Sequence, residues 1–286
     1  MQKIELCQNL LFTPANRVGR YEKAGELSFA DMICFDLEDA ISIQEKEVAR
    51  AVLLSYFQKQ KNYPSNHPIL VSVRVNSIKT SFGLKDISAF LENSFIPDLI
   101  VLPKVESVAE VEIYASLFSE KFSKASFIAM IETAKGLENA SEIAKHERVE
   151  VLAYGEIDLA SDLGAKLNLE NSLAFRSKIV QAAKASGKLA WDVPFLDFKN
   201  PKGLEKETEF VRNLGFDAKI AIHPNQLETI VKVLNPTEKE IQEAKEIIEI
   251  YEKANGSVCE YHGKMIDVPV IKKCQRILEK AKYVRK

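Results

Sequence analysis

Residues 31–56 read DMICFDLEDAISIQEKEVARAVLLSY and contain the pattern from which the fold class can be predicted. The apolar run at 32–36 is short and continuous, which is typical of a strand buried on both faces of a parallel sheet. Ser42-Ile-Gln-Glu45 follows as a capping box, which indicates the start of a helix. A stripe at helical spacing comes next, formed by Val48, Ala51, Val52, Ser55 and Tyr56. These residues therefore predict one strand followed directly by one helix.

The same alternation extends along the chain. Continuous apolar runs lie at residues 10–13, 32–36, 70–75, 99–102, 127–131, 151–154, 189–193 and 220–222. A second capping box, Ser107-Val-Ala-Glu110, follows the fourth run. Eight strand-then-helix units over about 225 residues predict a (β/α)8 TIM barrel. The alternative is an open doubly wound sheet, but the sequence has none of the glycine-rich phosphate or dinucleotide motifs that often accompany it.

The barrel is predicted to form one domain, residues 1–235. A new segment begins at Pro236, where Thr237-Glu-Lys-Glu240 caps a helix and a glycine-containing loop leads to a last helix. Residues 236–286 are therefore predicted to be a C-terminal helical extension. We expect this extension to pack on the barrel or on a neighbouring subunit.

The composition disfavours several classes of function. The 286 residues include 39 Lys and Arg against 41 Asp and Glu, a net charge of −2, which produces no field that would attract nucleic acid or anionic lipid. No apolar run reaches the ~18 residues of a membrane span, and the start of the chain does not resemble a secretory signal. The four cysteines and four histidines lack zinc-binding spacings. A cytoplasmic protein is predicted.

Ionisable residues follow nearly every apolar run, and in a barrel these positions meet at one mouth. Glu132 and Asp158 come after consecutive runs and offer oxygen atoms, the ligands that Mg²⁺ prefers, so we predict that they bind this ion. The alternative for each is a helix N-cap or a surface ion pair. Arg74 needs a carboxylate partner, either Glu38 or Asp39 or a substrate acid, and substrate binding is the favoured role.

Three further residues at strand ends have competing interpretations. Lys104 could be the nucleophile of a Schiff-base aldolase, but a solvated or phosphate-binding lysine is the favoured alternative. His223 is predicted to have a structural role, with general-base catalysis as the alternative. Asp162 is predicted to cap a helix or interact with its dipole rather than to bind metal.

At these positions the sequence resembles the citrate lyase beta subunit family, which also contains malyl-CoA and citramalyl-CoA lyases. The matching stretches are LLFTPANR (10–17), DMICFDLEDAIS (31–42), VRVNS (73–77), PDLIVLPKVES (97–107), AMIETAKGLENASEIA (129–144), YGEIDLASDLG (154–164) and LGFDAKIAIHPNQ (214–226). GKMIDVPVIKK at 263–273 resembles the closing motif of these lyases. One departure is Ile157, which separates Glu156 from Asp158, whereas relatives usually place the two acids together.

The resemblance implies a Mg²⁺ site at Glu132 and Asp158, with keto-acid oxygens bound by Arg74. It also implies that Glu38 and Asp39 support the arginine and the metal's waters. Asp267 would be the acid/base group, reaching into its own or an adjacent subunit's site in a homotrimer. From the residues alone, Asp267 is also a plausible N-cap of the last helix, since it stands two residues before Pro269.

These expectations combine into a Mg²⁺-dependent carbon–carbon lyase. Its substrate would be a 3-hydroxyacyl thioester of coenzyme A or of an acyl carrier, cleaved as citryl-CoA is, to acetyl-CoA and the small keto acid oxaloacetate. The alternatives are a stand-alone malyl-CoA or citramalyl-CoA lyase, and a carrier-dependent or non-catalytic subunit of a citrate lyase complex.

Overall fold

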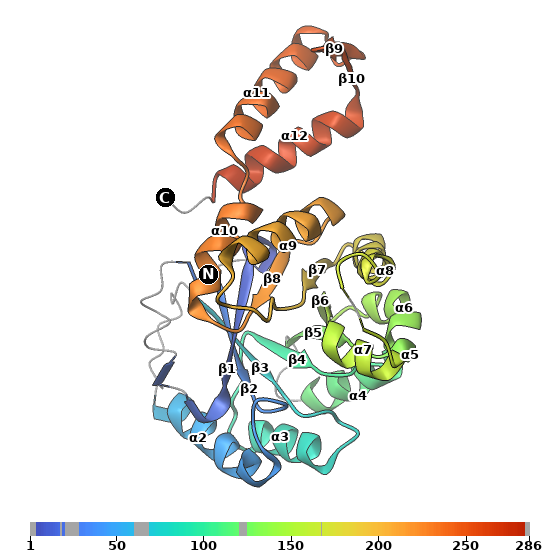
Figure 1. Cartoon of the computed structure of the whole chain (residues 1–286). Coiled ribbons are helices and arrows are strands. Elements are labelled where there is room, and N and C mark those ends of the chain that lie inside the picture. The colour runs from blue at the N-terminus through green and yellow to red at the C-terminus, as the bar shows by residue number, and fades with distance from the viewer. Residues whose placement is uncertain are drawn as a thin grey trace. The chain divides into compact units, whose positions relative to one another are not determined.

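The computed structural model describes residues 4–17, 19–20, 29–59, 69–119, 125–166 and 168–283. The chain forms two compact units, Met1–Ile230 and Val231–Lys286. Figure 1 shows the first unit as a ring of strands with helices around it, and the second as two long helices with a small hairpin. The predicted domain boundary between residues 235 and 236 stays a prediction.

The first unit is a closed barrel of eight parallel strands (Figure 1). Each strand pairs with its neighbours in the sequence, and the last closes the ring by placing Ile220 opposite Leu10. The strands are β1 (Asn9–Pro14), β2 (Met32–Asp36), β3 (Leu70–Arg74), β4 (Leu99–Leu102), β5 (Ser126–Ile131), β6 (Val149–Tyr154), β7 (Leu189–Asp192) and β8 (Ala218–Ala221). The predicted (β/α)8 barrel is confirmed, and the open sheet is wrong.

All eight predicted apolar runs are strands, with ends that differ by at most two residues. Their continuous apolar character arises because each strand is buried on both faces, by the barrel interior and by the outer helices. The interior is filled by a buried cluster that includes Leu10, Met32, Cys34, Leu99, Val101, Ile128, Val151, Trp191 and Ile220. This packed interior closes the barrel below the pocket described in the next subsection.

Helices alternate with the strands of the barrel. They are α2 (Lys46–Lys59), α3 (Ser81–Glu92), α4 (Val108–Ser119), α5 (Ala134–Glu138), α6 (Ala140–Ala144), α7 (Glu156–Leu163), α8 (Leu173–Ala185), α9 (Pro201–Leu214) and α10 (Leu227–Leu234). Short 3₁₀ turns are η1 (Ile4–Leu6), η2 (Ala15–Arg17), η3 (Ile43–Glu45) and η4 (Pro224–Gln226). The Ser42 capping box is wrong in detail, because the Ser42 hydroxyl donates to the Glu45 carboxylate and the helix begins as the 3₁₀ turn η3.

The stripe expected at helical spacing over residues 48–56 is not the buried face of α2. Val48 is 60% exposed, whereas Ala49, Leu53 and Leu54 are buried. Two cations share this buried face: the Lys46 ammonium donates to the carbonyls of Leu37 and Glu38, and Arg50 pairs with Asp86. Polar partners outside the helix therefore set its orientation. The spacing of apolar residues within the helix cannot predict these partners.

The second unit is built around two helices, α11 (Glu238–Lys253) and α12 (Val268–Ala281), which pack against each other. The hairpin β9 (Cys259–Tyr261) and β10 (Lys264–Ile266) joins them. Thr237 and Glu240 form the predicted capping box of α11. Asp267 is the N-cap of α12, where its carboxylate accepts from the Val270 amide at 3.3 Å, so the predicted cap is confirmed. The packing of this extension on the barrel or on another subunit stays a prediction.

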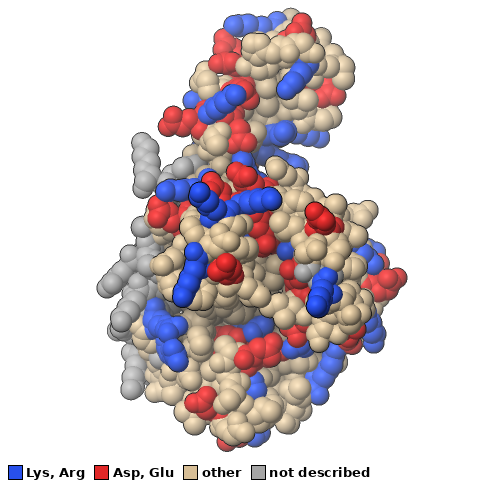
Figure 2. Space-filling model, viewed as in Figure 1, with Lys and Arg blue, Asp and Glu red and all other residues tan. Residues whose placement is uncertain are grey.

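The surface agrees with the nearly balanced charge. Figure 2 shows Lys and Arg side chains interspersed with Asp and Glu over the visible face. Among the described residues, no helix is long and apolar enough to cross a membrane.

Candidate active site

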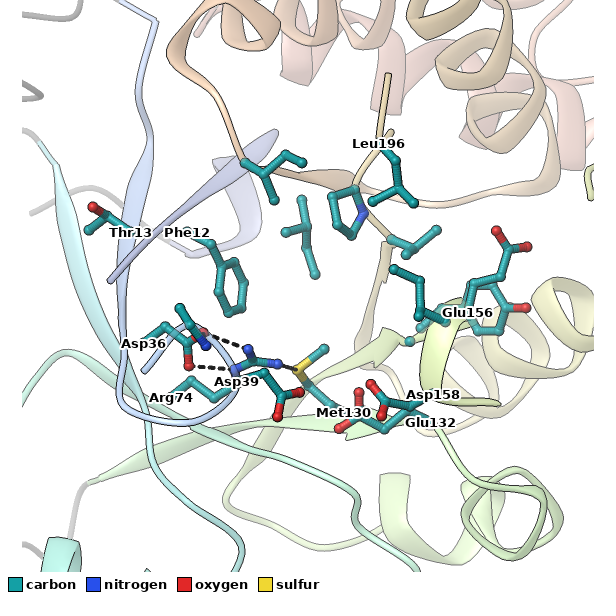
Figure 3. Close-up of a pocket in the computed structure, with 18 of the residues that line it drawn as sticks. Phe12, Thr13, Asp36, Asp39, Arg74, Met130, Glu132, Glu156, Asp158 and Leu196 are labelled. Carbon is teal, nitrogen blue, oxygen red and sulfur yellow. Dashed lines mark hydrogen bonds and ion pairs between the residues drawn. The ribbon is translucent and has the colours of Figure 1, made fainter. Parts of the chain in front are cut away.

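A cavity of about 480 Å³ opens at the carboxyl ends of the barrel strands (Figure 3). Its polar lining includes Thr13, Asp36, Asp39, Arg74, Glu132, Glu156 and Asp158. Its apolar lining includes Phe12, Met130, Ile157, Val193, Pro194, Leu196, Ile220 and Ile222. The ionisable side chains come from segments far apart in the sequence, and the parallel closure of the barrel brings them to one mouth.

Arg74 ends β3 and is held mainly by Asp36 at the end of β2. Its Nε and Nη2 atoms donate to the two Asp36 oxygens at 2.8 and 2.6 Å, and Nη1 lies 3.2 Å from Glu38 Oε2. The guanidinium also stacks over the Phe12 ring at 5.0 Å. Burial acts to lower the pKa of Arg74, but the Asp36 and Glu38 charges outweigh it and raise the pKa above its ordinary value. Arg74 therefore stays charged in the pocket.

Asp36 is a site residue that the sequence reasoning missed as a partner of Arg74. The expected partners were Glu38 and Asp39; of these, Glu38 contacts Arg74, whereas Asp39 lies 3.4 Å from the Lys104 ammonium. Asp36 and Arg74 are directly paired in the β2–β3 register. The signal available in the sequence was that both residues close an apolar run, which places them side by side once neighbouring strands are parallel.

Glu132 and Asp158 both line the pocket, and Figure 3 shows their carboxylates near each other. Glu132 follows β5, is 2% exposed and accepts from the Lys104 backbone amide at 2.8 Å. Asp158 is in the first turn of α7 and is partly exposed. Burial, with the negative charges of Glu38 and Asp158, raises the pKa of Glu132 to about 8. The structure thus brings together the two acids that the sequence suggested as a pair.

Gly155, the N-cap of α7, makes room for Glu132. A Cβ atom at position 155 would lie 2.5 Å from Glu132 Cβ and 2.6 Å from Glu132 Oε2. We expect Gly155→Ala to displace Glu132 and to lower the free energy of unfolding by about 1–3 kcal/mol, measured by urea denaturation. Gly19→Ala is the control, because no atom of the described residues lies within 4 Å of a Cβ there. Equal stability of the two variants would contradict this interpretation.

The carboxylates of Glu132 and Asp158, with Glu38 and Asp39 near them, fit a hard divalent cation. The donors are carboxylate oxygens, and the Lys104 ammonium already lies among them as a positive charge, 3.0 Å from Glu38, 3.4 Å from Asp39 and 3.4 Å from Asp158. Within the described ranges, no three His, Cys, Asp or Glu side chains form a ready-made metal cage. Two carboxylates with the remaining positions left to water and substrate oxygens is an arrangement that suits Mg²⁺.

The environment of Lys104 does not suit a Schiff-base nucleophile. Burial acts to lower its pKa, but Glu38 and Asp39 outweigh it and raise the pKa above the ordinary value. A nucleophilic lysine requires the opposite shift, since only the neutral amine attacks a carbonyl. The favoured alternative was a solvated or phosphate-binding lysine. In the structure the Lys104 ammonium is instead paired with three carboxylates.

Two other candidates have structural contacts. His223 is the N-cap of η4, accepts from the Asn225 amide at 3.2 Å and stacks on Phe198. Asp162 accepts from the Ala134 amide at 2.7 Å, so it caps the start of α5 rather than its own helix. The predicted structural roles of both residues agree with these contacts.

A buried ion network behind the pocket was not predicted. Arg176 pairs with Glu156 and with Asp192, each at 2.9 Å, and Asp192 also accepts from Lys219 at 2.5 Å. Arg176, Asp192 and Lys219 are fully buried. The network connects the first turn of α7, which carries Asp158, to β7 and β8. Glu156, which departs from the usual motif, belongs to this network and not to the Arg74 cluster.

The fold and the pocket together define a (β/α)8-barrel protein with a carboxylate-rich site at the carboxyl ends of its strands. The profile of the HpcH/HpaI aldolase/citrate lyase family matches residues 8–224, and the chain belongs to this family. The resemblance inferred from the sequence is confirmed.

Relatives match over nearly the full length. The citrate lyase subunit beta of Leuconostoc mesenteroides subsp. cremoris is 34% identical, covering 98% of this chain and 95% of its own. A (3S)-malyl-CoA thioesterase of Cereibacter sphaeroides is 35% identical, covering 97% and 95%. The crystal structure of CitE from Mycobacterium tuberculosis, in complex with magnesium, acetoacetate and coenzyme A, superposes with a TM-score of 0.81 at 28% identity, covering 96% of this chain and 98% of that one.

Proposed function

We propose that this protein is a Mg²⁺-dependent carbon–carbon lyase. It cleaves a 3-hydroxyacyl thioester of the citryl-CoA type into an acetyl thioester and a small keto acid, or runs the reverse condensation. The observation that carries the proposal is the convergence of Glu132, Asp158 and Arg74 on one cavity at the strand ends. The magnesium, acetoacetate and coenzyme A bound to the CitE relative support the same chemistry.

The acidic residues of the site and Arg74 have different proposed roles. Glu132 and Asp158 would hold Mg²⁺, Glu38 supports Arg74, and Asp39 would contribute an acceptor for the metal's waters. When bound, Mg²⁺ supplies a Lewis acid for the oxygen that becomes the keto group. Arg74 binds the keto-acid oxygens and stabilises the negative charge that develops on them. Both Asp36 oxygens accept from one edge of the Arg74 guanidinium, so the guanidinium is oriented before substrate arrives.

Asp267 is proposed as the acid/base group. Cleavage of the carbon–carbon bond leaves a thioester enolate, and the Asp267 carboxyl group protonates its carbon. In the reverse direction the carboxylate removes the acetyl proton. Asp267 belongs to the second compact unit. We propose that it acts in its own site or in that of a neighbouring subunit of a homotrimer.

A substrate panel tests the proposal. Purified protein is assayed with citryl-CoA, malyl-CoA and citramalyl-CoA, following keto acid, acetyl-CoA and free coenzyme A separately. We expect cleavage of at least one substrate, its loss with EDTA and its recovery with Mg²⁺. Turnover seen only after adding an acyl carrier would identify a carrier-dependent subunit. Failure on every substrate, with and without carrier, would refute the lyase.

The second candidate is a stand-alone malyl-CoA or citramalyl-CoA lyase. One observation favours it: the cavity wall that includes Val193, Pro194, Leu196 and Ile222 is apolar. Citrate carries a further carboxymethyl group on its hydroxyl carbon, and a carboxylate loses hydration against such a wall without gaining a partner. The (3S)-malyl-CoA thioesterase relative is named for malyl-CoA, one of these two substrates. A higher kcat/KM for malyl-CoA or citramalyl-CoA than for citryl-CoA would support this candidate.

Arg74→Lys is expected to lower kcat/KM by about 100-fold to 1,000-fold. A lysine ammonium cannot make the paired contacts that Arg74 forms with Asp36, so the cation would lose its orientation. Arg148→Lys is the matched control, since Arg148 precedes β6, outside the pocket lining, and donates to the carbonyls of Ala115 and Ala125. Steady-state kinetics distinguish the two, and equal kinetics would contradict the role of Arg74.

Mg²⁺ binding is expected to depend on pH. In the metal-free protein Glu132 has a pKa of about 8, against an ordinary value of 4.5, so the folded state keeps a proton that the unfolded state loses between these values. Its contribution to stability is therefore present below pH 4.5 and is lost as the pH rises through about 8. Mg²⁺ needs the carboxylate, so its affinity should rise by up to about tenfold per pH unit below pH 8 and then level off.

Calorimetry measures this coupling directly. Titrations with Mg²⁺ in two buffers of different ionisation enthalpy report the protons released on binding. We expect close to one proton per Mg²⁺ well below pH 8 and almost none well above it. A flat affinity without proton release would show that Glu132 is ionised before the metal binds.

A further inference from the structure

Lys104 contacts every acidic residue assigned to the metal site. Its ammonium lies 3.0 Å from Glu38 Oε1 and 3.4 Å from both Asp39 Oδ2 and Asp158 Oδ1. Its backbone amide donates to Glu132 Oε1 at 2.8 Å. These contacts join segments that follow β2, β5 and β6, so a single residue contacts all four of these carboxylates.

The backbone of Lys104 is unusual as well. Its φ angle is +49°, in the left-handed region that residues with a Cβ rarely adopt. This conformation lets the amide point at Glu132 while the side chain extends to the other acids. A strained residue is retained where the surrounding structure requires it, and such residues gather at functional sites.

Arg74, the cation that lines the pocket, does not replace Lys104. The paired donors of Arg74 are taken by both Asp36 oxygens, and its Nη1 atom lies near Glu38 Oε2 and the Met130 sulfur. Within the part of the chain that the structure describes, Lys104 is the only cation with an ion pair to Asp39 or Asp158. Without it, several carboxylates would repel one another across a partly buried cavity.

We propose that Lys104 is a built-in counter-cation: its ammonium holds the carboxylate cluster together in the metal-free protein, and a divalent cation must displace it from Asp158 in order to bind. This inference rests on the proposed metal site at Glu132 and Asp158. The side chain is 32% exposed, so its four-carbon stem has room to move toward solvent or substrate. Lys104 is therefore a positioning residue that lowers the affinity for Mg²⁺.

Two measurements on Lys104→Met test the proposal, neither of which uses turnover. Calorimetry with MgCl₂ should show binding about fivefold to tenfold tighter than in the wild type, because the competing charge is gone. The melting temperature in EDTA should fall, and saturating Mg²⁺ should restore it. Lys104→Arg should behave like the wild type, since it keeps the positive charge.

Lys85→Met is the matched control, because Lys85 forms an exposed ion pair with Glu47 at 2.6 Å on the outer helices. It should change neither Mg²⁺ affinity nor the effect of EDTA. Lys104→Gln repeats the test if the methionine variant is insoluble. Weaker or unchanged Mg²⁺ binding in both variants would overturn the counter-cation role and leave the lyase standing. If neither wild type nor variant binds Mg²⁺, both the metal site and this inference are wrong.

Discussion

Asp158→Ala is expected to abolish measurable Mg²⁺ binding and to lower kcat/KM by about a thousandfold or more. The substitution removes one of only two protein ligands assigned to the ion, and the metal's stabilisation of the reacting oxygen amounts to several kcal/mol. The fold should survive, because Asp158 is partly exposed and Lys104 keeps its closer contact with Glu38. Calorimetry with MgCl₂ and steady-state kinetics measure the two effects.

The control for Asp158→Ala lies in the same helix. Asp162 belongs to α7, and its carboxylate accepts from the Ala134 amide outside the pocket lining. Asp162→Asn keeps an acceptor oxygen and should leave Mg²⁺ affinity unchanged. Equal losses in the two variants would mean that damage to α7, and not the loss of a ligand, explains the result. Retained Mg²⁺ binding in Asp158→Ala would refute the proposed metal site.

Asp267→Asn is expected to retain Mg²⁺ binding and to lower kcat by about 100-fold to 10,000-fold, the usual contribution of a positioned acid/base group. Asparagine has nearly the same shape, and its side-chain oxygen can still accept from the Val270 amide at the start of α12. The amide cannot transfer the proton, so only the chemical step should suffer. A solvent-exchange assay of the acetyl methyl protons measures that step directly.

The capping role of Asp267 needs its own comparison. Asp267→Ala removes both the acid and the cap, so it should lose turnover and also about 1 kcal/mol of stability in α12. Asp267→Asn should lose turnover alone. Full turnover in Asp267→Asn would show that Asp267 only caps the helix. The two variants thus distinguish the two roles that the sequence left open.

The strands could be predicted because their signal is local. Each apolar run is bounded by polar residues, and a run buried on both faces is continuous whatever its neighbours are. The run at 99–102 matches β4 residue for residue. The inner face of α2 could not be found in this way, since Lys46 and Arg50 turn inward to reach Leu37, Glu38 and Asp86. Their partners are supplied by other segments.

The residues of the site could be predicted from the sequence more fully than the ion pairs between them. Glu132, Asp158 and Arg74 could be named because they follow apolar runs that end at one mouth. Asp36 as the main partner of Arg74, and Lys104 as the common partner of the acids, could not be named. Both pairings depend on the register between strands and on a positive φ angle at Lys104, neither of which has a local pattern.

The pattern of residues along this chain was sufficient to predict eight strands, a barrel as their favoured arrangement, and an acidic mouth with one arginine. A strand that is buried on both faces shows this in its own continuous run of apolar residues, so the strands can be read along the chain. Only the closed barrel determines which acidic residues form ion pairs with Arg74 and Lys104. Ion pairs depend on separations of a few ångströms between residues that stand dozens of positions apart, and packing alone sets those separations.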